Sequence, residues 1–98
     1  MIIDIECLAN PLGTEANPYE HVEAAIKVIQ DSGLKYEVNA LGTTVEGDPE
    51  DLWPLIRKVH EACLESGAKS LVTVVKIEQA RADQPQPTID SLTGKFRS

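Results

Sequence analysis

Basic residues, aromatic residues and long apolar runs are all scarce in this chain of 98 residues. Lysine and arginine number 9 against 16 acidic residues, which gives a net charge of −7. A nucleic-acid-binding domain needs a basic stripe to neutralise phosphates, so that class of partner is excluded. No apolar run approaches the roughly 20 residues that cross a bilayer, so no membrane partner is expected. Aromatics make up only 4% of the residues, which predicts an aliphatic core.

Cysteine is also rare, and its two positions show no spacing typical of a metal site. Cys7 and Cys63 lie far apart in sequence, and His60 with Cys63 would supply only two ligands, so no metal is predicted. Neither cysteine has a local histidine motif, no serine lies in a nucleophile elbow, and no phosphate loop appears. We therefore expect no catalytic residue, no cofactor and no enzyme activity. Both thiols are predicted to be reduced in a cytoplasmic protein that begins with a strand rather than a basic leader.

Alternating strand and helix patterns fill residues 1–80, which predict a single domain. Four segments have the two-residue period or the β-branched composition of strands: residues 2–9, 35–41, 43–46 and 69–79. Two segments have helical periodicity, one from Asn17-Pro18 to Gly33 and one from Asp48-Pro49 to Gly67. Residues 81–98 are richer in glutamine, proline, serine and threonine, and are predicted to be a polar C-terminal tail or an oligomer arm.

Details of the two helices follow from their caps and stripes. Asn17 is the expected N-cap of the first helix, and Gly33 its left-handed terminator. His21, in the first turn, is expected to face solvent. Pro54 lies past the positions where a missing N–H is free, which predicts either a bend near Glu50 or a helix start nearer Asp51. The apolar stripes are expected at Val22, Ala25, Ile26 and Ile29, and at Leu52, Ile56, Val59 and Cys63.

The order strand, helix, strand, strand, helix, strand predicts an α+β fold, the ferredoxin-like βαββαβ sandwich. In this arrangement a four-stranded antiparallel sheet has two helices on one face, and the first and third strands are central. Alternation then exposes Leu8, Val72 and Val74 together on the uncovered face. Exposed apolar patches of this kind usually mark association, so we expect a homo-oligomer.

Small polar residues gather in two predicted turns and in the second and third strands. Gly13 and Thr14 follow the first strand, and a glycine lets a ligand approach the main chain closely. The hairpin offers an amide, two hydroxyls and a carboxylate at Asn39, Thr43, Thr44 and Glu46. An amide next to a carboxylate can hydrogen-bond the edge of an aminopyrimidine, and the carboxylate favours a cation. The alternative is that the glycines only permit tight turns.

The segments Pro-Leu-Gly-Thr-Glu (11–15), Tyr-Glu-Val-Asn-Ala-Leu-Gly-Thr-Thr-Val-Glu-Gly-Asp (36–48) and Val-Thr-Val-Val-Lys-Ile (72–77) resemble the thiamine-binding protein family. The resemblance covers residues 2 to about 81. It implies a ferredoxin-like subunit without catalytic activity, assembled as a tetramer by pairing of dimers. It also implies binding of thiamine or its hydroxymethylpyrimidine moiety. Carried onto this chain, the ligand-binding residues would be Gly13, Thr14, Asn39, Thr43, Thr44 and Glu46.

Two functions therefore follow from the sequence. The first is non-enzymatic binding of thiamine or hydroxymethylpyrimidine by a homo-oligomeric protein. The alternative is an oligomeric protein-interaction or structural module with no dedicated small-molecule ligand. Saturable binding of a thiamine-related compound distinguishes the first from the second.

Overall fold

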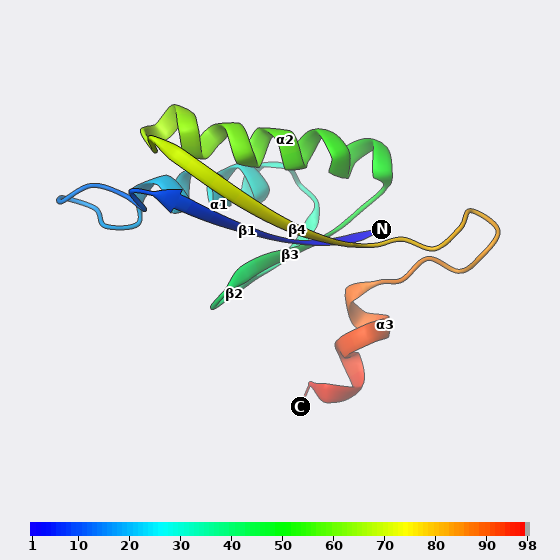
Figure 1. Ribbon diagram of the computed structural model, residues 1–98. Helices are drawn as coiled ribbons and strands as arrows, with labels where there is room; N and C mark the ends of the chain where they lie inside the picture. Colours follow the sequence, from blue (N-terminus) through cyan, green and yellow to red (C-terminus); the bar gives the residue numbers. More distant parts are fainter. Residues whose placement is uncertain (98) are drawn as a thin grey trace.

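The computed structural model describes residues 1–97 and arranges them in a sheet with two long helices against it (Figure 1). The elements are β1 (Ile2–Asn10), α1 (Glu20–Asp31), β2 (Lys35–Asn39), β3 (Gly42–Glu46), α2 (Pro49–Ser66), β4 (Ser70–Glu78), α3 (Ile89–Thr93) and a 3-10 turn, η1 (Gly94–Phe96). The sheet order is β2-β3-β1-β4, and every neighbouring pair is antiparallel. The predicted four-stranded antiparallel sheet with central first and third strands is confirmed. No helix among the described residues is long and apolar enough to span a membrane.

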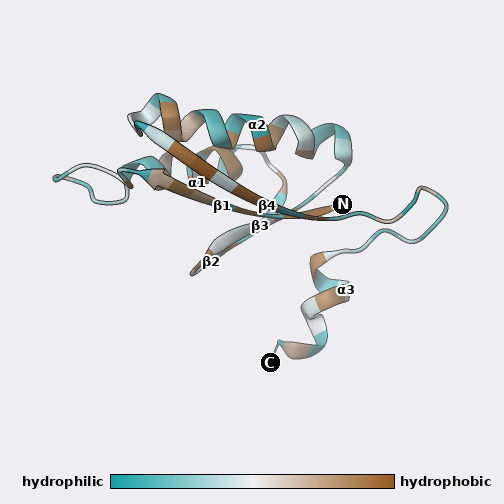
Figure 2. Cartoon of the chain, viewed as in Figure 1, coloured by the Kyte–Doolittle hydropathy of each residue, from teal (hydrophilic) through white to brown (hydrophobic). Residues whose placement is uncertain are grey.

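The core lies between one face of the sheet and the two long helices. Ile3 and Ile5 of β1 and Val45 of β3 share the inner face because alternate side chains of a strand point the same way. They pack against apolar residues of α1 and α2, among which Ile29 and Leu52 are fully buried. Figure 2 shows apolar bands on β1, β4 and α2, whereas the connecting loops are mostly polar.

The expectation of two helices is wrong, because the C-terminal segment forms a third. Thr88 and Ser91 form a reciprocal capping box, in which each side chain accepts a hydrogen bond from the other's main-chain N–H. Ile89, the first residue of α3, is buried. The helix lies on the side of the sheet away from α1 and α2 (Figure 1). A role of residues 81–98 in an oligomer stays a prediction.

The starts of the two long helices also differ from expectation. The helix α1 begins at Glu20 with Tyr19 at its N-cap, not at Asn17-Pro18. The Asn17 side chain instead accepts a hydrogen bond from the Tyr19 N–H at 3.4 Å within the preceding turn. The helix α2 begins at Pro49, so the predicted start near Asp51 is wrong, and it continues through Pro54 to Ser66.

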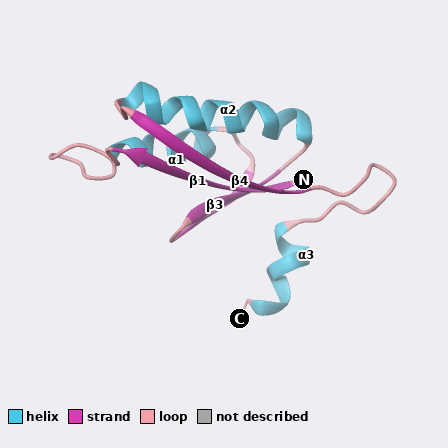
Figure 3. Cartoon of the chain, in the orientation of Figure 1, coloured by secondary structure: helices cyan, strands magenta, loops and turns pink. Residues whose placement is uncertain are grey.

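Unequal strand lengths give the sheet a step beside β1. The strands β1 and β4 each have 9 residues, whereas β2 and β3 each have 5. The register between β1 and β3 ends at the pair Ile5 and Thr43, while β1 pairs with β4 as far as Asn10. Beyond Ile5, β1 therefore has a neighbour on the β4 side alone, and the β2–β3 hairpin diverges from it (Figure 3).

Candidate functional site

A cavity of about 460 Å³ lies where the hairpin diverges from β1. It is bounded by β1, by α1 and by the tip of the hairpin, and the loop before α1 contributes Leu12 and Tyr19. Its walls are mainly apolar. The residues lining it are Ile5, Glu6, Cys7, Leu8, Leu12, Tyr19, Val22, Glu23, Ala25, Ile26, Ile29, Val38, Asn39, Ala40, Leu41, Gly42, Thr43 and Val59. This size and lining are typical of a site for one small molecule.

One face of α1 supplies a wall of the cavity. Val22, Ile26 and Ile29 recur at helical spacing, and Glu23 lies beside them and adds a carboxylate. Tyr19 comes immediately before the helix and is 60% exposed, so its ring stands free at the cavity. An aromatic ring beside an aliphatic wall can stack on a planar ligand.

The position of this wall is fixed by His21, which is buried rather than facing solvent as expected. Its Nδ1 lies 2.7 Å from the Ser66 hydroxyl at the end of α2. Its main-chain N–H donates to the Leu12 carbonyl at 3.1 Å. His21 therefore ties the start of α1 both to α2 and to the loop that carries Leu12. The burial of a polar ring is explained by these partners, which sequence periodicity does not reveal.

The six predicted ligand-binding residues do not gather at one place. Asn39 and Thr43 line the cavity, and Thr43 is 5% exposed. Thr44 points to the opposite face of the sheet, because neighbouring strand residues alternate. There its hydroxyl donates to Asp4 at 3.2 Å and accepts from the Asn39 amide at 3.4 Å. The side-chain amide of Asn39 is thus committed to the outer face.

Glu46 lies at the other end of β3 and anchors the C-terminal helix. Its Oε1 accepts a hydrogen bond from the Ile89 N–H at 2.7 Å. In the loop before α1, the Thr14 hydroxyl accepts a hydrogen bond from the Asn17 N–H at 3.1 Å. A Cβ at Gly13 would collide with the main chain of Asn17 and Pro18. Of the residues described in the structure, Gly13, Thr14, Thr44 and Glu46 are not among those that line the cavity.

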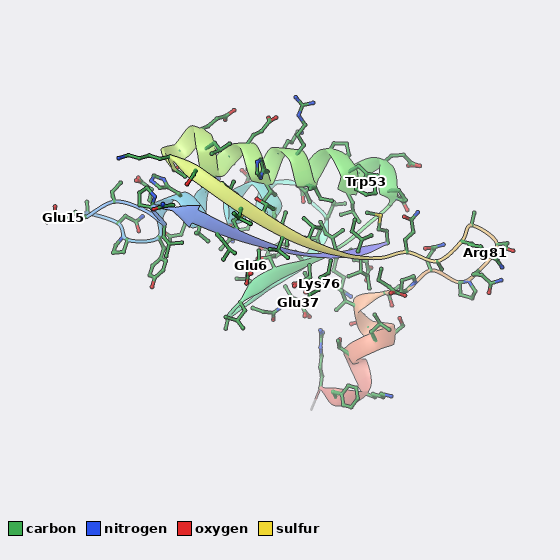
Figure 4. The ribbon with its side chains drawn as sticks, viewed as in Figure 1. Glu6, Glu15, Glu37, Trp53, Lys76 and Arg81 are labelled. Carbon is green, nitrogen blue, oxygen red and sulfur yellow. The ribbon has the colours of Figure 1, made fainter. Side chains whose placement is uncertain are left out.

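Two acidic residues of the cavity lining are not among the predicted ligand-binding residues. Glu23 lies on the cavity-facing side of α1. Glu6 belongs to β1 (Figure 4), and its side chain alternates with Ile5 and Cys7, so it lies on the outer face at the edge of the cavity. The signal for Glu23 was available, since it directly follows Val22 on the apolar stripe. The signal for Glu6 was not, because its position at the cavity depends on where β3 ends. Glu23 is therefore the acidic side chain on the helix side of the cavity, where a carboxylate favours a cationic ligand.

Two thiols interact beneath the cavity. Cys7 lines it and Cys63 is buried in the core beside it, and neither forms a disulfide in this structure. A hydrogen bond from Cys63, assisted by Thr73, lowers the pKa of Cys7, although its burial opposes this shift. The same interaction raises the pKa of Cys63, and so does burial. Cys7 is therefore the thiol that ionises first. Within residues 1–97, no group of three or more histidines, cysteines or acidic residues could hold a metal ion.

Comparisons with known proteins find similar sequences along most of this chain. The family described as thiamine-binding protein matches residues 5–96. A UPF0045 protein of Clostridium perfringens is 34% identical over 87 residues, which cover 89% of this chain and 88% of the relative.

Solved structures are also similar to this protein along nearly its whole chain. A domain of unknown function DUF77 from Bacillus cereus has a TM-score of 0.86 and 30% identity, covering 98% of this chain and 88% of the other. A candidate thiamine biosynthesis/salvage protein from Thermotoga maritima has a TM-score of 0.80 and 28% identity, covering 98% of this chain and 97% of the other. With a family match over nearly the whole chain, this protein belongs to the thiamine-binding protein family.

Proposed function

We propose that this protein binds thiamine or its hydroxymethylpyrimidine moiety in the cavity beside β1, without catalysing a reaction. The observation that carries the proposal is the cavity itself, whose volume of about 460 Å³ is of the size that holds a small molecule. Apolar walls and the Tyr19 ring suit a planar ring, and the Glu23 carboxylate suits the positive charge of a thiazolium. Membership of the thiamine-binding protein family supports the same ligand class.

The test is calorimetric titration with thiamine, its phosphates and free hydroxymethylpyrimidine. A matched pair of variants then locates the site. Glu23→Gln removes a carboxylate that lines the cavity, whereas Glu20→Gln removes one from the same helical turn that does not. Thiamine affinity should fall by roughly tenfold or more in Glu23→Gln and stay unchanged in Glu20→Gln, since a charge-assisted contact contributes about 1.5–3 kcal/mol. Absence of saturable binding by the wild-type protein would refute the proposal.

We also propose that the protein is a homo-oligomer, in keeping with a tetramer formed from two dimers. The supporting observation is the outer face of the sheet, where Leu8 is 49%, Val72 61% and Val74 42% exposed. Leu8 and Val72 face each other in the register of β1 and β4, so their side chains form one apolar patch.

The same patch favours the alternative function, an interaction module without a dedicated ligand. That module would bind a partner protein through the patch and would leave the cavity empty. The titration separates the two functions, because a module of this kind gives no saturable heat with any thiamine-related compound while its oligomer is intact.

A further inference from the structure

Where β1 borders the cavity, its main chain is paired with β4 but has no neighbouring strand on the β3 side. In an antiparallel sheet a residue directs its N–H and C=O to the same neighbouring strand, and the next residue directs them to the other neighbour. The Met1 carbonyl points to the β3 side, because it accepts a hydrogen bond from the Gly47 N–H, just beyond β3, at 3.1 Å. The Ile5 carbonyl also points to that side, because a Cβ at Gly42 of β3 would lie 3.2 Å from its oxygen. The Asn10 carbonyl instead accepts from the Lys69 N–H at 2.9 Å, next to β4. Odd-numbered residues of β1 therefore face β3.

Cys7 is the next odd-numbered residue after Ile5, where the register with β3 ends. Its N–H and C=O therefore point to the β3 side, where β1 no longer pairs with β3. Among residues 1–97, no main-chain group of the turn beyond β3 hydrogen-bonds to either of them. Cys7 is partly exposed and lines the cavity, so this donor and acceptor border space that a ligand can fill.

A donor and an acceptor on one side of an extended residue match one edge of an aminopyrimidine. The N–H can donate to a ring nitrogen, and the C=O can accept from the neighbouring exocyclic amine. The apolar walls on α1 and the hairpin would hold the ring in plane with the strand. Polar groups left without partners in an apolar site are costly, which gives selectivity for a ring that satisfies both.

We propose that the main-chain N–H and C=O of Cys7 recognise the aminopyrimidine edge of the ligand, whose ring takes the place that a longer β3 would occupy. This inference rests on the proposed function and assigns the atoms that would give it selectivity. The thiol of Cys7 has no part in this recognition. Its side chain lies on the inner face with Ile3 and Ile5.

Two variants at one position separate the main chain from the side chain. Cys7→Pro removes the N–H, which β4 does not use, and proline is tolerated where the N–H of a strand is unpaired. Cys7→Ala removes the thiol and keeps the N–H. With hydroxymethylpyrimidine as the probe, Cys7→Ala measures the effect of losing the thiol alone, and we expect affinity in Cys7→Pro to be lower than in Cys7→Ala by roughly tenfold or more. The wild-type protein should also bind the analogue that lacks the exocyclic amine roughly tenfold or more weakly than hydroxymethylpyrimidine.

Amide hydrogen exchange in the wild-type protein gives a second measurement that does not depend on whether Cys7→Pro folds. Bound hydroxymethylpyrimidine should slow exchange of the Cys7 amide about tenfold or more. The Leu8 amide is the internal control, because it already faces β4 in the ladder. This inference is overturned, and the proposed function survives, if the probe binds but slows exchange of the Cys7 amide no more than that of the Leu8 amide, and if Cys7→Pro binds it as tightly as Cys7→Ala does. If no pyrimidine or thiamine compound binds wild type, both are overturned.

Discussion

Gly67 and His21 meet where α2 ends and α1 begins, and the contact depends on a missing side chain. Gly67 has a φ of 132°, a conformation that side chains disfavour. A Cβ there would also lie 2.9 Å from Cε1 of His21. The glycine thus lets the buried ring approach Ser66 at the same helix end.

Substitution of Gly67 by alanine should lower the free energy of unfolding by about 2 kcal/mol, because both backbone strain and the clash with His21 oppose it. Gly94→Ala is the matched control. Its backbone is right-handed helical, and a Cβ there meets nothing within 4 Å. Urea denaturation should show Gly94→Ala unchanged or slightly stabilised. Equal stability of the two variants would mean that the His21 ring moves aside without cost.

The ionisation of Cys7 should be visible in its reactivity. Because the Cys63 hydrogen bond lowers the pKa of Cys7 from 9.0, its thiolate forms at a lower pH than an ordinary thiol. Alkylation by iodoacetamide, followed by mass spectrometry, should reach its half-maximal rate below pH 9.0. Cys63→Ala removes the donor and should move that midpoint upward. A midpoint that stays in place would show that Cys63 does not stabilise the thiolate.

At the scale of elements, the alternation of strands decided which predictions succeeded. It correctly divided β1 into a buried series with Ile3 and Ile5 and an outer series with Asp4 and Glu6. The same rule puts Thr43 and Thr44, both predicted ligand-binding residues, on opposite faces of the sheet. The cavity itself was beyond the sequence pattern, because it arises from the unequal lengths of β1 and β3.

The polar composition of residues 81–98 gives no sign of α3, whereas its capping residues do. The sequence contains the capping pair Thr88 and Ser91 directly around the apolar Ile89. Long-range contacts then hold the helix on the sheet. Lys35 bonds Asp90 at 2.8 Å, and Arg97 forms an ion pair with Glu37. These pairs join residues far apart in the chain, so no local pattern indicates them.

Docking of α3 should depend on Glu46, whose carboxylate accepts the Ile89 N–H. Glu46→Ala should speed exchange of the Ile89 amide roughly tenfold, because the donor loses its partner. Glu78→Ala is the control, because Ile2 pairs with Glu46 on β3 and with Glu78 on β4. It should leave the exchange rate of the Ile89 amide unchanged. Unchanged exchange in Glu46→Ala would show that the ion pairs and the burial of Ile89 hold the helix without it.

Acid should release the same helix. The hydrogen bond from Lys35 lowers the pKa of Asp90 from 3.8. The contribution of this pair is therefore complete above pH 3.8 and is lost as the pH falls below that value, through the lower pKa of the docked state. In this pH range the nuclear magnetic resonance chemical shifts of α3 should move toward random-coil values. In Asp90→Asn they should already be closer to random-coil values at pH 7 than in the wild-type protein. Signals of α3 that do not change in Asp90→Asn would exclude the pair as an anchor.

On the scale of the whole molecule, the outer face of the sheet has two unlike ends. One end is covered by α3 and carries the ion pairs with Lys35 and Glu37. The other end carries the patch of Leu8, Val72 and Val74. With a net charge of −7, the molecule repels its own copies except where an apolar surface outweighs that repulsion. Association is therefore expected at the second end.

Light scattering should give about four times the mass of the chain for the wild-type protein. Val72→Glu places a carboxylate in the patch, where burial of a charge is costly, and should lower the measured mass. Leu64→Glu is the control, since Leu64 is 41% exposed on α2, away from the patch. A monomeric wild-type protein, or equal masses of both variants, would contradict association through this surface.

The step in the sheet also has an evolutionary consequence. Side chains change by mutation, whereas the direction of a peptide group depends on the strand's register and length. A ligand held by the peptide groups of β1 would thus tolerate many residue types at position 7 but no extension of β3. Selectivity of this kind would persist among relatives whose sequences share few polar residues. An inserted residue pair that lengthens the hairpin would pair with Cys7 and remove this selectivity, even if no other residue of the chain changed.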